Sequence, residues 1–170
     1  MSADDEPGDG SSRKRLRVPG AAYLLSQLGA HSSRRWQERL APIGLDARSV
    51  LVLRHVAAEQ GRTQSSLSAS LAVPPSRIVG IVDELERRGL LERRANPNDR
   101  RAHALWLTGS GHAVLGELLA ISRAHEAEIC AGLPESDRRR LIELLERIVS
   151  EQRLARGSHP RLGEPPDRRR

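Results

Sequence analysis

Aromatic residues are scarce in this chain of 170 residues, which contains no phenylalanine and only Tyr23, Trp36 and Trp106. Hydrophobic residues still make up 38% of the chain, enough for the packed core of one domain of ordinary size. That core must be built mainly from Leu, Val, Ile and Ala. Because Leu and Ala are strong helix formers, the composition favours a largely helical fold.

Cysteine is nearly absent as well, and Cys130 is the only one. A single cysteine excludes a disulfide framework or a cysteine-based metal site within one chain. No apolar run approaches the roughly 18–20 residues that cross a bilayer, and the N-terminal residues lack the apolar segment of a secretory signal. We therefore expect a cytoplasmic protein without membrane contact, in which Cys130 is a small buried residue rather than a redox sensor.

The charge is unbalanced toward arginine. The formal net charge is +6, and Lys14 is the only lysine. A basic balance favours a polyanionic partner such as nucleic acid, although a basic surface without such a partner and a GC-rich genome are alternative explanations. Residues 1–18 and 156–170 contain few residues that could be buried, so we expect both tails to be disordered. The basic C-terminal tail either adds non-specific DNA affinity or is a solvated end.

Between the tails, the hydrophobic periodicity and the capping residues predict six helices and one β-hairpin. Asp46, Thr63 and Thr108 are suited to cap helix N-termini, and Gly89 is suited to end a helix in the left-handed region. Asn-Pro-Asn-Asp at 96–99 is turn chemistry. The expected helices span about 20–40, 47–60 and 64–71, then from Pro74-Pro75 to the stop at Gly89, then 109–131 and from Pro134 onward. The expected strands span 90–94 and 102–107.

Two short helices joined by a tight turn and followed by a hairpin predict a winged helix-turn-helix. Ile78, Val82 and Leu85 recur with helical spacing and give the second helix an apolar inner face. Its first turn, Pro74-Pro75-Ser76-Arg77, would then face DNA base edges. The Arg77 guanidinium suits the O6 and N7 atoms of guanine, with a phosphate contact or a solvated arginine as the alternatives.

The hairpin is predicted to be the wing, and it is rich in arginine. Arg93, Arg94, Arg100 and Arg101 are opposed only by Glu92 and Asp99. A basic loop of this size can enter the minor groove and neutralise phosphates. Asp99 is better explained as a brace that pairs with a nearby arginine.

The segment Gly89-Leu90-Leu91-Glu92-Arg93, followed by the run Asn96-Pro97-Asn98-Asp99-Arg100-Arg101 and by Leu105-Trp106-Leu107-Thr108, closely resembles the signature of the MarR (multiple antibiotic resistance regulator) family. The resemblance covers roughly residues 20–152. It implies a mainly α fold with a small β-hairpin wing, in which a winged helix-turn-helix is combined with a helical dimerisation lobe. The implied division is 1–18 tail, 19–45 dimerisation helix, 46–108 DNA-binding domain, 109–155 dimerisation helices and 156–170 basic tail.

The resemblance also implies a function: a homodimeric transcriptional regulator, a repressor by default, that binds a pseudo-palindromic double-stranded DNA operator. By position, Asp99 would be the wing brace and Arg101 the minor-groove arginine. Ser65, Ser66, Ser76 and Arg77 occupy positions where relatives touch DNA. Gly80, where many relatives carry a polar or basic residue, and the Pro74-Pro75 helix start depart from the pattern and leave the operator sequence open.

Relatives of this type often release DNA when a small molecule binds between the two lobes. By placement, the candidates for an aromatic or anionic effector are Trp36, Arg54, His55 and His112. The competing interpretation of Trp36 is a core residue, because it continues the apolar spacing of Leu24 and Leu28.

We expect no cofactor, no metal and no enzyme activity. The sequence has no glycine-rich phosphate loop and no helical histidine pair, and its six histidines are scattered. The alternative to a DNA-binding regulator is a winged-helix adaptor that contacts only other proteins, and the arginine-rich wing argues against it.

Overall fold

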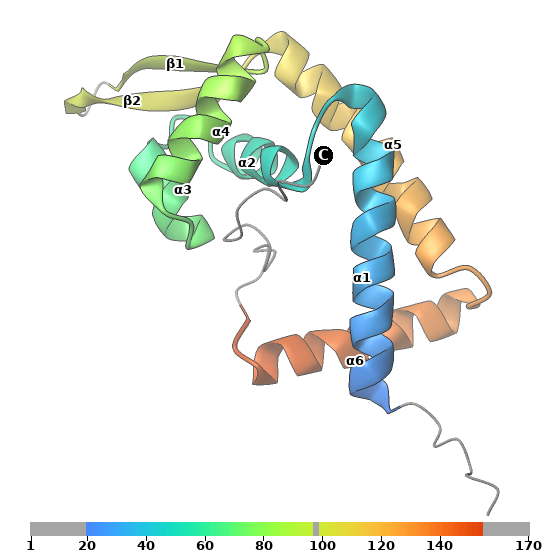
Figure 1. The fold of residues 1–170 in the computed structure, drawn as a ribbon. Helices are drawn as coiled ribbons and strands as arrows, with labels where there is room; N and C mark the ends of the chain where they lie inside the picture. The colour runs from blue at the N-terminus through green and yellow to red at the C-terminus, as the bar shows by residue number, and fades with distance from the viewer. Residues whose placement is uncertain (1–19, 97–98, 155–170) are drawn as a thin grey trace, which may run out of the picture.

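The computed structural model describes residues 20–96 and 99–154, except for the side chains of 99–102. Its element order is that of a winged helix-turn-helix inserted between long helices (Figure 1). The predicted disordered tails, 1–18 and 156–170, lie outside the described residues. The elements are α1(Ala21–Leu40), η1(Ala41–Ile43), α2(Ala47–Ala58), α3(Gln64–Leu71), α4(Pro75–Arg87), β1(Leu91–Asn96), β2(Asp99–Leu107), α5(Gly109–Ile129) and α6(Glu135–Glu151).

Three helices begin at the predicted capping residues. The Asp46 carboxylate accepts a hydrogen bond from the Ser49 backbone N–H at 2.8 Å. Thr63 Oγ1 accepts from the Ser66 N–H at 3.1 Å, and Thr108 Oγ1 accepts from the Gly111 N–H at 3.0 Å. Each cap satisfies a backbone donor that has no partner inside the helix. The predicted helix starts are therefore confirmed, whereas α2 ends two residues before the predicted residue 60.

The core of the lobe that contains the helix-turn-helix is formed where α2, α3 and α4 meet the hairpin. Ile78, Val82 and Leu85 are all at most 1% exposed, so the predicted inner face of α4 is confirmed. The turn between α3 and α4 is held by the buried Ser68 hydroxyl, which donates to the Val73 carbonyl at 2.6 Å. Other buried members of this core are Leu40, Val52, Leu53, Val56, Leu67, Leu91 and Leu105.

The hairpin is longer than predicted. β1 and β2 pair antiparallel, with Leu91 opposite Leu107 and Arg93 opposite Leu105, and the register shifts between Ala95 and Asn96. Leu90, the predicted first residue of the strand, precedes β1 and is buried. On its other edge, β2 forms one isolated antiparallel β-bridge, between Ala104 and Thr63, the residue that precedes α3.

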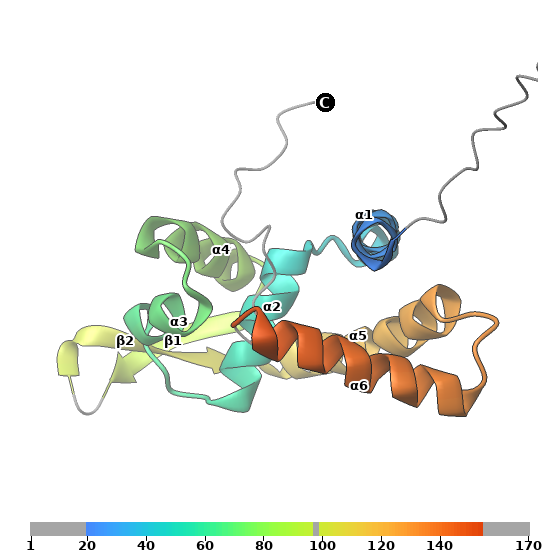
Figure 2. The ribbon, with the colours of Figure 1, turned by 90° about the horizontal axis from the view of Figure 1, so that it is seen from below.

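The long helices extend away from this lobe. α1 and α5 pack together, and the first residues of α1 and all of α6 lie at the opposite end from the hairpin (Figure 1). In Figure 1 α6 crosses α1, but the view in Figure 2 shows that the two helices are separated. No residue of α6 is buried. Leu141, Ile142, Leu144 and Ile148 of α6 are exposed, whereas Leu145 and Val149 are half-buried. Most of the apolar surface of α6 is therefore not covered by the described part of its own chain.

Candidate nucleic-acid interface

The outward face of α4 is small and partly apolar. Ser76, Val79, Gly80 and Asp83 are exposed at helical spacing, opposite the buried Ile78 and its neighbours. Val79 is 41% exposed, and a Cβ placed at Gly80 would meet no atom within 4 Å. Val79 was not among the contacts predicted from the sequence, although the same periodicity that buries Ile78 turns the next residue outward. An exposed valine on a groove-reading helix can contact the methyl group of thymine.

The predicted contacts at the helix starts lie on the surface of the same lobe. Ser65, Ser66, Pro75 and Ser76 are exposed, and Arg77 is half-buried. Arg77 and Ser76 line a shallow cleft of about 310 Å³ between α4 and the start of α2, together with Asp46, Arg48, Ser49, Gly80, Ile81 and Glu84. The cleft contains two arginines and two carboxylates, so its charge is mixed.

The described arginines of the hairpin have partners within the lobe. Arg94 lies over the Trp106 ring, 4.7 Å from its centroid, and pairs with Glu92 at 2.5 Å. Arg93 pairs with Asp83 at 2.5 Å and with Glu86, both on α4. Arg94 is half exposed, whereas the Arg93 side chain is only 21% exposed. Arg94 therefore remains accessible for a polyanion, while the Arg93 guanidinium is occupied.

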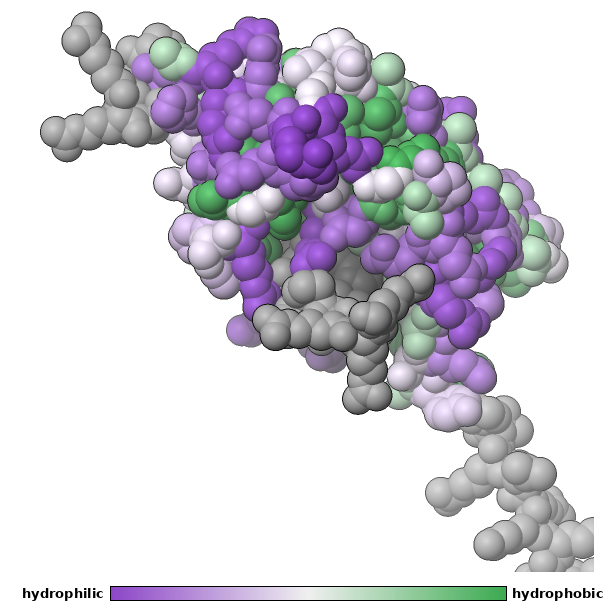
Figure 3. Space-filling view, turned by 45° about the horizontal axis from the view of Figure 1, so that its top comes forward, coloured by the Kyte–Doolittle hydropathy of each residue, from purple (hydrophilic) through white to green (hydrophobic). Residues whose placement is uncertain are grey.

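The end of the wing is described only in part. β2 includes Asp99, Arg100 and Arg101, but only their backbone is described and not their side chains. The brace predicted for Asp99 and the groove contacts predicted for both arginines therefore stay predictions. The face drawn in Figure 3 is largely hydrophilic, with smaller hydrophobic areas between the polar residues.

None of the four predicted effector residues lines the cleft beside α4 or a second hollow formed by Leu144, Ile148 and their neighbours on α6. Trp36 packs against the core and against the His125 ring, with 5.3 Å between centroids, as the core interpretation expected. His55 is half-buried, and its Nδ1 lies 3.0 Å from the Leu51 carbonyl oxygen. Arg54 and His112 are exposed.

A polar network between α1 and α5 was not predicted from the sequence. Arg35 Nε donates to Glu128 at 2.6 Å, and Arg39 pairs with the other oxygen of the same carboxylate. These hydrogen bonds lower the pKa of Glu128 to about 2. Ser32 Oγ lies 2.9 Å from His125 Nε2. Burial, and then the charge of Arg39, lower the pKa of His125 below its usual value, so this imidazole is neutral at pH 7.

Cys130 follows α5 and is buried, as predicted. Its thiol donates to the Glu126 carboxylate at 3.3 Å. Burial and then this carboxylate raise the pKa of the thiol. Because the thiolate is the reactive form, these surroundings disfavour the reactive form of Cys130.

The described side chains, those of residues 20–96 and 103–154, contain no group of three or more histidine, cysteine or acidic side chains arranged to hold a metal ion. Within the same ranges, no helix is long and apolar enough to cross a membrane.

Comparisons with known proteins support the order of elements described above. Residues 43–102 match the family model described as MarR family. A protein of Thauera aromatica, named as a transcriptional regulatory protein for the hcr operon, is 33% identical over 97 residues, which are 57% of this chain and 58% of that protein. The chain thus spans just over half the length of this relative.

Two solved structures are similar over most of the chain. A transcriptional regulator (MarR family) from Rhodococcus sp. RHA1 is 31% identical, with a TM-score of 0.64, and the match covers 75% of this chain and 90% of that one. The transcriptional repressor CouR, solved bound to a 23-mer DNA duplex, is 29% identical with a TM-score of 0.68, covering 76% and 92%. CouR from Rhodococcus jostii RHA1 has also been solved bound to p-coumaroyl-CoA.

Proposed function

Because the chain belongs to the MarR family of transcriptional regulators, we propose that it is a sequence-specific double-stranded DNA-binding repressor that a small molecule releases from its operator. The observation that carries this proposal is the pairing of two surfaces on one lobe. α4 exposes a face of small side chains, and the hairpin beside it carries arginines. A helix of that kind fits the major groove while a basic wing reaches the adjacent minor groove.

Base reading is assigned to the first two turns of α4. Arg77 is proposed to contact guanine or a phosphate, and Val79 a thymine methyl group. Ser65, Ser66, Pro75 and Ser76 are exposed around the same helix starts and would position the lobe through sugar and phosphate contacts. Gly80 adds no side chain to this face, so α4 can approach the floor of the groove closely.

The wing is proposed to supply affinity rather than most of the sequence preference. Arg94 is accessible, and Arg100 and Arg101 follow the turn in sequence. Arginine in a narrow minor groove is attracted by its negative potential, and Arg101 occupies the family position for that contact. We retain Asp99 as the brace of the wing tip.

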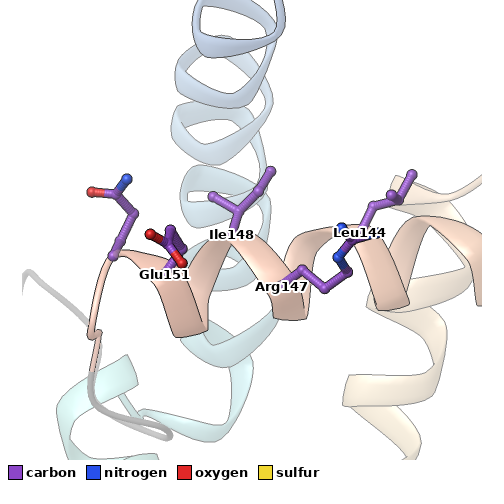
Figure 4. A pocket seen from close by; sticks show the side chains of 5 residues that line it. Leu144, Arg147, Ile148 and Glu151 are labelled. Carbon is purple, nitrogen blue, oxygen red and sulfur yellow. The ribbon is translucent and has the colours of Figure 1, made fainter.

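The repressor is proposed to act as a homodimer. α6 exposes Leu144 and Ile148 on the same side (Figure 4), where they line a groove of about 510 Å³ with Arg147, Glu151 and Gln152. Large apolar side chains are also exposed on α1, including Leu24 and Leu28. Exposed large apolar side chains on two helices indicate a protein partner. A second copy would cover both helices and place two α4 helices on the half-sites of an inverted repeat.

The proposed division of the chain follows from this assignment: 46–108 binds DNA, and 19–45 with 109–155 form the dimer. The effector is proposed to be an aromatic or anionic molecule, since CouR has been solved with p-coumaroyl-CoA. Trp36, Arg54, His55 and His112 remain the candidate contacts. The protein is proposed to be cytoplasmic and not an enzyme.

The test is a titration of the full chain onto labelled duplexes at several salt concentrations. A DNA-binding protein loses affinity steeply with salt, because each neutralised phosphate contributes about −0.9 to the slope of log K against log salt. Arg101→Ala should weaken binding to the operator, taken as the sequence that the wild-type protein selects from a randomised duplex library, and make the slope of log K against log salt shallower. The matched control is Arg87→Ala, which removes an exposed arginine already paired with Glu84 at 2.6 Å. Binding of no duplex at low salt would refute the proposal and favour the protein adaptor.

A second titration tests the reading of thymine by Val79. In an operator where single thymines are replaced by uracil, the wild-type protein should lose affinity at one position in each half-site, because one buried methyl group is worth about 0.8 kcal/mol. The Val79→Ala variant should be insensitive to the same replacement. Equal losses for both proteins would remove Val79 from the reading face.

A further inference from the structure

Arg93 connects the hairpin to the recognition helix by three hydrogen bonds. Its Nη2 donates to Asp83 Oδ1 at 2.5 Å, and its Nη1 donates to Glu86 Oε2. Its backbone N–H donates to the other oxygen of Glu86 at 3.3 Å. The two carboxylates lie on consecutive turns of α4, and Arg93 lies in β1 beyond the turn at Gly89. The guanidinium therefore spans the corner where the helix meets the wing.

The charges at this corner would oppose DNA binding if they were unpaired. Asp83 is 56% exposed on the same side of α4 as Val79, and Glu86 is 37% exposed. Free carboxylates there would repel phosphate. Burial lowers the pKa of Arg93, but hydrogen bonds and charge from Asp83 and Glu86 outweigh it and raise the pKa overall. Arg93 thus stays charged and neutralises the acidic side of α4.

We propose that Arg93 is a positioning residue, which fixes the angle between α4 and the hairpin and does not itself contact DNA. This inference rests on the proposed function and replaces the direct DNA contact first expected of Arg93. The angle matters because α4 and the wing must enter adjacent grooves of one rigid duplex at the same time. Arginine suits this role, because its planar fork can bridge two carboxylates, whereas lysine is a point charge.

Two sets of variants separate a positioning role from a DNA contact. Arg93→Met removes the bridge from the hairpin side, and the double variant Asp83→Asn with Glu86→Gln removes it from α4. If Arg93 positions the wing, both should weaken operator binding by about tenfold, the size expected for losing a charge-assisted hydrogen-bond pair. Combining all three substitutions should cost little more than either set, because they break the same bridge.

A phosphate contact would give different results. Arg93→Met would then lower the steepness of the salt dependence by about 0.9, and the double variant would bind DNA more tightly because two negative charges leave the interface. The positioning role predicts weaker binding for the double variant. It also predicts the same slope for the double variant with and without Arg93→Met, because no carboxylate is then left unpaired beside the phosphates. A shallower slope together with tighter binding by the double variant would overturn the proposal.

Hydrogen exchange tests the bridge without DNA, so that its failure can be told apart from failure of the proposed function. In Arg93→Met and in the double variant, amides of β1 and β2 should exchange faster, while α1 and α5 stay as in the wild type. The control is Arg87→Met, whose ion pair with Glu84 lies within α4 alone. Unchanged exchange in β1 and β2 would refute the bridge even if the wild type binds its operator. Faster exchange with no DNA binding by the wild type would refute the function instead.

Discussion

Replacing Gly111 by alanine should destabilise the fold strongly, because the start of α5 lies against the backbone that precedes β1. A Cβ at Gly111 would lie 2.1 Å from the Leu90 carbonyl oxygen and 3.1 Å from Leu107 Cδ2. Carbon–oxygen contacts normally begin near 3.3 Å, so the helix start would have to move by about 1.2 Å. That movement pulls on two hydrogen bonds of Thr108, to the Leu90 carbonyl at 3.2 Å and to the Gly89 carbonyl at 2.6 Å.

The size of the effect follows from these contacts. Overpacking costs about 1–3 kcal/mol, two weakened hydrogen bonds cost about 1 kcal/mol each, and the better helix propensity of alanine offsets about 1 kcal/mol. We therefore expect Gly111→Ala to lower the free energy of unfolding by about 2–4 kcal/mol. The matched control is Gly80→Ala, which adds the same methyl group in α4 where no atom lies within 4 Å. It should raise stability by up to about 1 kcal/mol.

Urea unfolding at one fixed protein concentration measures both variants, and the concentration must be held because subunit association adds to apparent stability. The reasoning predicts opposite signs for the two glycines. If Gly111→Ala and Gly80→Ala change the free energy of unfolding by similar amounts in the same direction, the close approach of α5 to Leu90 is wrong.

The remaining predictions concern the contacts that connect α1, and the short helix η1 after it, to the rest of the fold. The pKa of Glu128 is about 2 in the fold, because of hydrogen bonds from Arg35 and Arg39, against 4.5 ordinarily; its contribution to stability is therefore complete above pH 4.5 and is lost as the pH falls toward 2. Unfolding titrations of Glu128→Gln should lack that part of the acid dependence. The pKa of His125 lies below its ordinary value of 6.5. As the pH drops below 6.5 the unfolded chain therefore takes up this proton before the folded chain does, and the free energy of unfolding falls; His125→Asn should reduce this dependence. Unchanged pH profiles of stability in both Glu128→Gln and His125→Asn would contradict the network. Arg88 donates to the Gly44 carbonyl and to the Ile43 carbonyl at 2.8 Å, so Arg88→Ala should speed hydrogen exchange in 41–44 while the hairpin stays protected, and faster exchange throughout the lobe would instead indicate general unfolding.

Local chemistry was enough to predict most of the fold. Asp46, Thr63 and Thr108 cap helices in the structure as their types and positions indicated, and the spacing of the apolar residues in α4 identified the buried face. The hairpin extends beyond its predicted ends because strand pairing continues through polar residues, and a hydrophobic pattern does not report such pairing. β1 starts at Leu91 and not at Leu90, because the Leu90 N–H still donates to the Leu85 carbonyl at the end of α4.

The contacts that were missed join residues far apart in sequence. Glu128 meets Arg35 across 93 positions, and neither residue carries a local signal of the pairing. Arg93 was expected to touch DNA because arginines in a wing usually do so. Its actual partners, Asp83 and Glu86, became apparent only when β1 was placed beside α4. Val79 carries no polar group, so its residue type gave no signal of a base contact.

The central claim is that two copies of this chain read an inverted repeat through α4. Selection of bound sequences from a randomised duplex library by the purified full-length protein tests it most directly. We predict enrichment of inverted repeats whose half-site centres lie about one helical turn, or roughly 10 base pairs, apart. Recovery of unselected sequence, or of single half-sites without symmetry, would contradict the account.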